Sequence, residues 1–186
     1  LYTIHAGNSR LTSNLVLDFM EINNKLWVTT DGGGINIMDM DDPSDMTAIM
    51  HTPGDMSTIP VNSIKCIYKD KQENIWVGTV RGGMIGIKEV FMKTYKDVPL
   101  NNTNGLSDIS VSSIHEDKKG RLWLGTDGGG INQYNPYTDT FKHYPATYGD
   151  KVVSITDYSD SELLVSLYTK GLYLFNKETG RYSRPF

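Results

Sequence analysis

Short runs of alternating apolar and polar residues fill the chain, and most runs end at glycine, proline, asparagine or aspartate. Such alternation is typical of β-strands, and no stretch has the 3.6-residue period of a helix. The pattern predicts four groups of four short strands. They are expected at residues 16–20, 26–30, 35–40 and 47–51; 63–68, 75–79, 84–89 and 93–97; 111–116, 122–126, 131–134 and 140–144; and 152–156, 163–167, 172–175 and 181–183.

One phrase recurs in every group. It reads Leu-Trp-Leu-Gly-Thr-Asp-Gly-Gly-Gly-Ile-Asn at 122–132 and Leu-Trp-Val-Thr-Thr-Asp-Gly-Gly-Gly-Ile-Asn at 26–36. A third copy lies at 75–84, and a fourth at 163–172 lacks the tryptophan. The equivalent positions are separated by 49 (76 − 27), 47 (123 − 76) and 41 (164 − 123) residues. A repeat of this length is one supersecondary unit that stacks on its neighbours.

The second strand of each group is apolar on both faces. Leu122 and Leu124 lie on one face and Trp123 on the other, which suits a strand buried between two neighbouring sheets. We therefore predict an all-β fold, a β-propeller built from four-stranded antiparallel blades. We expect the tryptophans to fill the space between neighbouring blades. We expect the last glycine of each turn to permit a tight hairpin. These residues are Trp27, Trp76 and Trp123, and Gly34, Gly83, Gly130 and Gly171.

The whole of 1–186 is predicted to be one partial propeller domain. Its blade units are expected at roughly 9–52, 61–97, 108–144 and 151–186, and 1–8 resembles the outer strand of a preceding blade. Propellers have about four to eight blades. Because the leading strand would be surplus in a closed ring of four, we expect about four blades of a larger, roughly seven-bladed ring. Exposed end faces would favour a homodimer.

The amino-acid composition is typical of a globular protein, and the charge argues against some classes of partner. A net charge of −4 and a pI near 5.5 argue against nucleic-acid binding, and no apolar run is long enough for a membrane helix. Cys66 is the single cysteine, expected to be buried and inert. The four histidines are not at metal-ligand spacing, so we expect no metal, no cofactor and no catalytic residue. They are His5, His51, His115 and His143.

The repeat resembles that of the two-component regulator propellers. The resemblance is carried by Val111–Glu116, the Gly120-Arg121 turn, the 122–132 phrase, Tyr134-Asn135-Pro136 and Phe141–Tyr144. It implies the periplasmic sensor region of a Bacteroides-type hybrid two-component histidine kinase, with further blades and a second propeller in the parent chain. It also implies signal transduction, through a phosphorelay, in response to an oligosaccharide. The kinase and receiver residues are not in this sequence.

Ligand contacts are predicted where the turn after the second strand departs from glycine. The aligned turn positions are Asp31, Val80, Asp127 and Tyr168; Gly32, Arg81, Gly128 and Thr169; and Gly33, Gly82, Gly129 and Lys170. Departures from local consistency often mark function. Arg81 and Lys170 suit a carboxylate or sulfate of an acidic sugar, Tyr168 suits a pyranose face, and Asp31 and Asp127 flank them. Ordinary variation of turn residues explains the same pattern.

Two other functions fit the repeat. One is an enzyme similar to the streptogramin lyases, whose propellers carry related repeats; such enzymes need a catalytic histidine and a divalent metal on the axial face. The other is a purely structural or dimerisation propeller.

Overall fold

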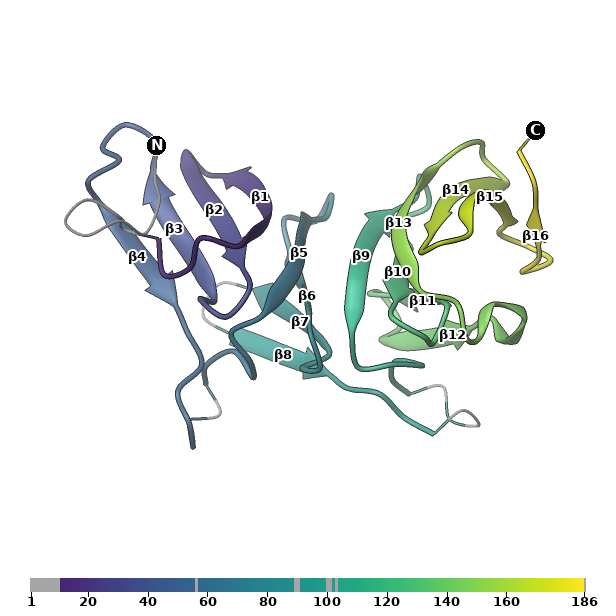
Figure 1. The fold of residues 1–186 in the computed structure, drawn as a ribbon, viewed down its shortest axis with the longest axis horizontal. Coiled ribbons are helices and arrows are strands. Elements are labelled where there is room, and N and C mark those ends of the chain that lie inside the picture. The colour runs from purple at the N-terminus through teal and green to yellow at the C-terminus, as the bar shows by residue number, and fades with distance from the viewer. Residues whose placement is uncertain (1–10, 56, 89–90, 100–101, 103, 186) are drawn as a thin grey trace. The chain divides into compact units, whose positions relative to one another are not determined.

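The computed structural model describes residues 11–55, 57–88, 91–99, 102 and 104–185. It is all-β, with four antiparallel sheets of four strands and one short 3-10 turn, Pro145–Thr147 (Figure 1). The fold-class prediction is confirmed. The strand predicted within residues 1–8 lies outside the described residues.

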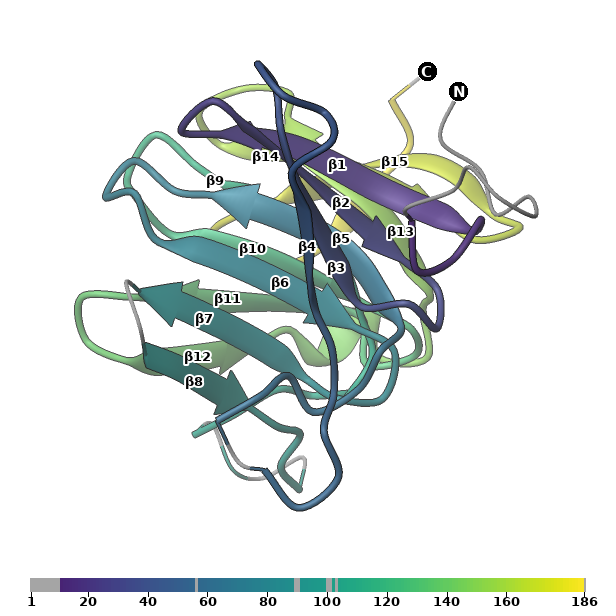
Figure 2. The ribbon, with the colours of Figure 1, turned by 90° about the vertical axis from the view of Figure 1, so that its left-hand side faces the viewer.

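Each sheet consists of four strands that follow one another in the sequence, as Figure 2 shows for β5 to β8. The sheets are β1 (Val16–Ile22), β2 (Lys25–Thr30), β3 (Ile35–Asp39) and β4 (Met46–Ile49); β5 (Ile64–Lys69), β6 (Ile75–Thr79), β7 (Met84–Lys88) and β8 (Phe91–Tyr95); β9 (Val111–Glu116), β10 (Leu122–Thr126), β11 (Ile131–Asn135) and β12 (Thr140–His143); and β13 (Val152–Asp157), β14 (Glu162–Leu167), β15 (Gly171–Asn176) and β16 (Tyr182–Ser183).

Every predicted strand has a counterpart, and the largest difference is the eighth. Residues 93–97 were expected to be extended, whereas β8 ends at Tyr95. The backbone beyond it pairs with the loop before the third repeat: Val98 N–H donates to Leu106 O, and Leu106 N–H donates to Lys96 O, each at 3.0 Å. These bonds replace the predicted continuation of the strand.

The described chain forms two compact units. The first ends at Thr94 and contains the sheets that begin with β1 and β5, and the second begins at Tyr95 and contains the sheets that begin with β9 and β13. The predicted single partial domain over 1–186 and its ring of blades stay predictions.

Within each unit, the first strands of the two sheets are linked through a side chain. In the first unit, Ile67 N–H donates to the Asp18 carboxylate at 3.0 Å. In the second, Ile155 N–H donates to Ser113 Oγ at 3.1 Å. Asp18 and Ser113 occupy the same place in their strands, just after a β-bulge that all four first strands share. The bulge turns a polar side chain of one sheet toward the backbone of the next.

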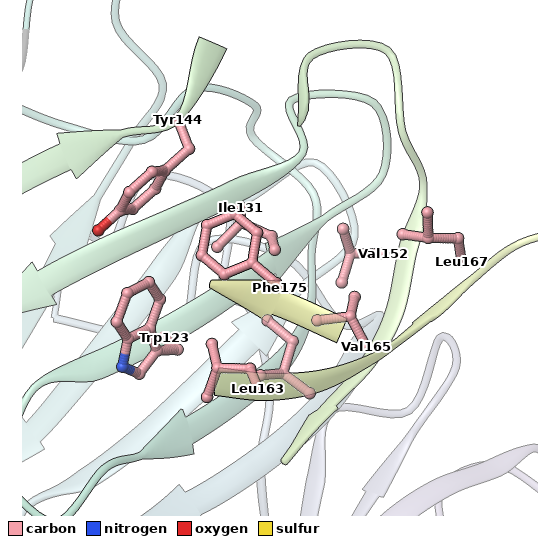
Figure 3. Close-up of a cluster of buried hydrophobic side chains, with 9 residues drawn as sticks. Trp123, Ile131, Tyr144, Val152, Leu163, Val165, Leu167 and Phe175 are labelled. Atoms are coloured by element: carbon pink, nitrogen blue, oxygen red, sulfur yellow. The ribbon is translucent and has the colours of Figure 1, made fainter. Parts of the chain in front are cut away.

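Trp123 belongs to the buried core of the second unit (Figure 3). Its side chain is 0% exposed. The indole stacks on Tyr144 at 5.6 Å and meets the edge of Phe175 at 5.8 Å, and Leu163 and Val165 of β14 belong to the same buried cluster. Trp123 therefore packs between the sheets that begin with β9 and β13.

Trp27 has the same position in the first unit but is only partly buried. It packs against a cluster that includes Ile64, Ile67 and Val77 of the second sheet. The equivalent Trp76 is buried at 5% exposure.

Cys66 lies on β5 and is buried, as predicted. Desolvation raises the pKa of its thiol to about 12, so the thiolate needed for nucleophilic chemistry is disfavoured.

Candidate functional site

The turns after the second strands share one construction in three sheets. A threonine hydroxyl at the end of the strand donates to the carbonyl of the turn's last glycine, at 2.7–3.0 Å. The glycine has a positive φ in every case. The pairs are Thr30 with Gly34, Thr79 with Gly83 and Thr126 with Gly130. In the fourth sheet Leu167 replaces the threonine, so this turn lacks the hydroxyl bond.

Arg81 and Thr169 occupy a strained position of this turn. Their φ angles are +61° and +62°, where the other two sheets have Gly32 and Gly128. A non-glycine residue in the left-handed region costs free energy and is uncommon outside functional sites and special turns. Of the three departures noted in the sequence, Arg81 therefore carries backbone strain, whereas in the fourth turn the strained residue is Thr169, which lies between Tyr168 and Lys170.

In the first unit the structure places Asp31 and Arg81 on two different turns, and both are exposed. The Asp31 carboxylate accepts a hydrogen bond from Ser63 Oγ at 2.6 Å. Ser63 precedes β5 of the next sheet, so this bond ties the two sheets together at the turn.

In the second unit the structure brings three predicted residues, Asp127, Tyr168 and Lys170, to one set of loops. Lys170 Nζ binds the Asp150 carboxylate at 2.5 Å, and Lys151 Nζ binds Asp127 at 3.1 Å. Asp150 and Lys151 are consecutive, and Tyr168 N–H donates to Lys151 O at 2.9 Å. The two ion pairs and Tyr168, which is joined to them through the Lys151 backbone, are called here the turn cluster.

Charges in the turn cluster are mutually neutralised. The hydrogen bond from Lys170 to Asp150, together with their charges, raises the lysine pKa. Asp150 is nearly buried, whereas the Tyr168 side chain is 62% exposed. The cluster therefore presents an accessible aromatic ring beside fixed, paired donors and acceptors. Lys170 is paired with Asp150, and its predicted contact with a ligand stays a prediction.

Sequence reasoning missed Asp150 and Lys151 because each bonds to a residue of another turn. The sequence did contain one signal. Asp150 and Lys151 stand immediately before β13, whereas the uncharged Ile109 and Ser110 stand at the same place before β9.

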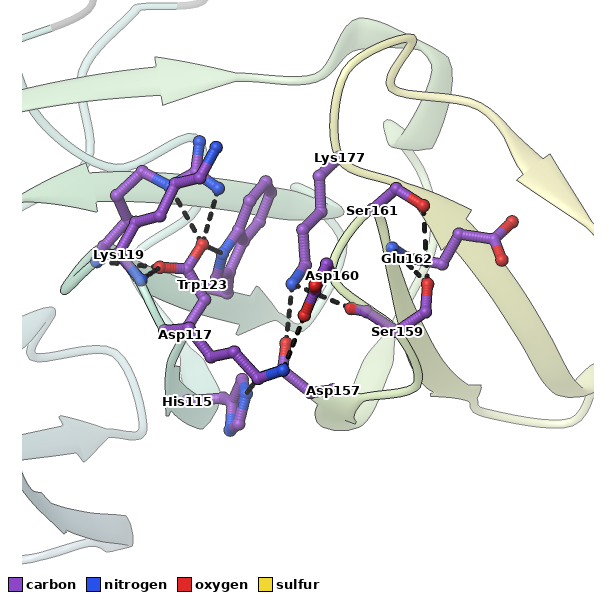
Figure 4. A network of polar contacts seen from close by, with 12 residues as sticks. His115, Asp117, Lys119, Trp123, Asp157, Ser159, Asp160, Ser161, Glu162 and Lys177 are labelled. Carbon is purple, nitrogen blue, oxygen red and sulfur yellow. Dashed lines mark hydrogen bonds and ion pairs between the residues drawn. The ribbon is translucent and has the colours of Figure 1, made fainter.

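At the opposite ends of the strands, a buried aspartate organises the hairpin between first and second strands. Asp117 accepts hydrogen bonds from the Trp123 indole N–H at 3.0 Å and from Arg121 Nε at 2.8 Å (Figure 4). Burial raises its pKa, but the bonds from Arg121 and Trp123 outweigh that effect and hold the pKa below its ordinary value. Asp70 holds Trp76 in the same way at 2.7 Å.

The described histidines make local contacts. His51 Nδ1 lies 2.9 Å from Ile59 O, and His143 Nε2 lies 2.8 Å from Gly105 O. His115 lies 3.4 Å from the Asp157 carboxylate. Among the described residues, no group of three or more His, Cys, Asp or Glu is arranged to hold a metal ion. His5 lies outside the described residues.

Within the part of the chain that the structure describes, no helix has the length and apolar character needed to cross a membrane.

Four-stranded antiparallel sheets with these turns and tryptophan contacts define the chain as a protein of β-propeller blades. Residues 58–81 and 105–128 match the two component regulator propeller family. Each match covers the first two strands of a sheet and part of the following turn. Two segments of the chain are therefore similar to the repeats of the two-component regulator propeller family.

Several solved structures share the fold. The extracellular domain of the putative hybrid two component system BT3049 from B. thetaiotaomicron is similar over 97% of this chain, with a TM-score of 0.77 and 18% identity. The corresponding domain of BT4673 is similar over 98%, with a TM-score of 0.70 and 20% identity. The chain spans about a quarter of each, 24% and 25%.

A virginiamycin B lyase from Staphylococcus aureus also has this fold, with a TM-score of 0.67 and 16% identity. The match covers 94% of this chain and 55% of the lyase. No curated protein sequence matches the chain.

Proposed function

We propose that the chain is a non-catalytic signal-input segment from the periplasmic sensor region of a hybrid two-component histidine kinase, and that it binds an oligosaccharide. The observation that carries the proposal is the combination of two regulator-propeller repeats with a backbone similar to the extracellular domain of BT3049 over 97% of the chain. The likeness concerns the fold. The ligand and the signalling role are inferred from the local chemistry and from the family.

The turn cluster is the proposed ligand contact in the second unit. An exposed aromatic ring such as Tyr168 can pack on the apolar face of a pyranose. The ion pairs Lys170–Asp150 and Lys151–Asp127 hold donors and acceptors in place beside it, and such fixed polar groups give a site its orientation and specificity. Because both lysines are paired, hydroxyl groups suit this cluster better than a free anion does.

Further blades or a second copy of the chain are the proposed partners. The sheet that begins with β1 exposes an apolar face, with Phe19 at 66% exposure beside a hollow of about 280 Å³. The equivalent face of the next sheet, which includes Val77 and Ile87, is buried against Trp27 and its neighbours. An apolar face of this kind favours coverage by another sheet.

A lyase-like enzyme is the second candidate, and the similarity to virginiamycin B lyase is the observation that favours it. Of the described histidines, His51 and His143 each hold one ring nitrogen near a backbone carbonyl, and His115 lies 3.4 Å from the Asp157 carboxylate. A general base needs a ring nitrogen within reach of the substrate.

Calorimetric titration with a panel of neutral and acidic oligosaccharides tests the proposal. We expect one of them to give saturable heat and to raise the melting temperature, because a ligand that binds only the folded state stabilises it. Mass spectrometry of the mixture should recover the saccharide intact. Turnover of a saccharide that a chelator abolishes would establish an enzyme instead. If no saccharide of the panel bound, a purely structural propeller would be the function supported.

A further inference from the structure

Two of the three tryptophans have their indole N–H bound by an aspartate six positions earlier. Asp70 binds Trp76 at 2.7 Å, and Asp117 binds Trp123 at 3.0 Å. In both sheets the carboxylate is buried within the hairpin that joins the first two strands. In these two sheets the aspartate lies beside the tryptophan ring, at the hairpin end of the strands.

The first sheet lacks this aspartate because its hairpin is shorter. Ile22 pairs directly with Lys25, which leaves a two-residue turn of Asn23 and Asn24 at φ +52° and +60°, the geometry of a type I′ hairpin. The residue six positions before Trp27 is Glu21, which is exposed on the strand opposite Leu26. Within the described residues, the indole N–H of Trp27 has no hydrogen-bond acceptor.

A hollow of about 410 Å³ lies beside Trp27, between the two sheets of the first unit. This size is in the range of about 300–1,000 Å³ that is usual for small-molecule sites. Its apolar wall consists of the Trp27 ring with Ile22, Ile75 and Ile87. In the two equivalent sheets the indole N–H points to an aspartate of the hairpin between the first two strands, and the corresponding hairpin of this sheet, with Asn23, borders the hollow.

Polar groups occupy the rim of the hollow. Asn23 and Lys25 come from the short hairpin, and Lys69 and Glu73 come from the next sheet. Lys69 and Glu73 form an ion pair at 2.7 Å. Lys25 is exposed and forms no ion pair with any residue that the structure describes. The rim therefore offers one unneutralised cation, amide groups and a fixed ion pair.

We propose that this hollow binds a sugar acid, such as a uronate residue of an acidic oligosaccharide. A pyranose uronate has an apolar face for the Trp27 ring, ring and glycosidic oxygens that accept from its N–H, a carboxylate for Lys25, and hydroxyl groups for Asn23 and the Lys69–Glu73 pair. Charged hydrogen bonds of the lysine–carboxylate kind are stronger than neutral ones. The site lies at the opposite end of the strands from the Asp31 and Arg81 turns, and its assignment does not depend on a signalling role.

Tryptophan fluorescence of the purified protein provides the test, since Trp76 and Trp123 are buried and bound to aspartate whereas Trp27 is not. We expect trigalacturonate to change the emission saturably and to bind at least about tenfold more tightly than neutral galactotriose. Trp27→Phe keeps an aromatic ring but removes the N–H and should weaken calorimetric binding about tenfold. Lys25→Ala, a change at an exposed position, should remove the preference for the acidic sugar.

Trp76→Phe is the matched control: it removes an indole N–H outside the hollow and should leave the affinity unchanged. Equal affinity for both sugars, or binding that survives Trp27→Phe and Lys25→Ala unaltered, would overturn the assignment. Tighter binding of phenylacetate than of the uronate would also overturn it, in favour of an aromatic acid. A negative result for this hollow would not affect the proposal for the turn cluster, because the residues of the turn cluster lie in the other unit and are unchanged in these variants.

Discussion

Trp123→Ala is expected to lower the free energy of unfolding of the second unit by about 3–5 kcal/mol. The side chain is 0% exposed, stacks on Tyr144 and meets the edge of Phe175, so its removal leaves a cavity between two sheets and takes one hydrogen-bond donor away from the buried Asp117 carboxylate. Urea unfolding followed by circular dichroism measures the loss.

Trp27→Ala is the comparison for this prediction. It should cost clearly less, because its ring is only partly buried and its N–H is not bonded to a buried aspartate. Equal losses for the two variants would show that burial between sheets is not what the tryptophan contributes.

Gly130→Ala is the second change with a large expected effect, about 3–5 kcal/mol of unfolding free energy. Gly130 has φ +73°, and a Cβ there would overlap the backbone carbonyl and the hydroxyl of Thr147. The left-handed conformation costs about 1–2 kcal/mol for a residue with a Cβ, and overpacking adds about 1–3 kcal/mol. The displaced Thr147 hydroxyl would also lose its bond from Ile131 N–H.

Gly171→Ala separates the two contributions. Gly171 has φ +88°, but no atom lies within 4 Å of where its Cβ would be. Only the conformational cost of about 1–2 kcal/mol should remain. Thermal unfolding of the two variants side by side measures the difference, and a Gly171→Ala loss as large as that of Gly130→Ala would refute the role of the close approach to Thr147.

The strands were predictable because their signal is local. The alternation of Ile64, Lys65 and Cys66 in β5 and the apolar residues on both faces of β10 identify each strand and its burial from neighbouring residues alone. Because the same strand pattern occurs four times, each copy supports the assignment of the others, and together they predicted a four-stranded blade. The end of β8 was predicted two residues too late, because the backbone of Lys96 and Val98 forms hydrogen bonds with Leu106 of the following loop.

The candidate site was only partly predictable, because its partners come from separate turns. Alignment of the copies singled out Tyr168 and Lys170, but it contained nothing about the Lys170–Asp150 ion pair, which joins residues 20 positions apart. The aspartates that hold Trp76 and Trp123 were visible as a repeated spacing. Their role depends on a hydrogen bond across the hairpin, which the pattern of apolar residues does not encode.

We propose that residues obeying the repeat hold the fold and that residues departing from it bind ligand. The most direct test is calorimetric affinity for the best saccharide of the panel in Tyr168→Ala and Lys170→Ala, with Lys118→Ala as control. Lys118 forms an ion pair with Asp160 at 2.5 Å, the same length as Lys170–Asp150, but at the other end of the strands. We expect the first two variants to lose about tenfold or more in affinity, with the Tyr168→Ala melting temperature unchanged, and Lys118→Ala to bind as the parent does. Undiminished affinity in both turn variants would contradict the account.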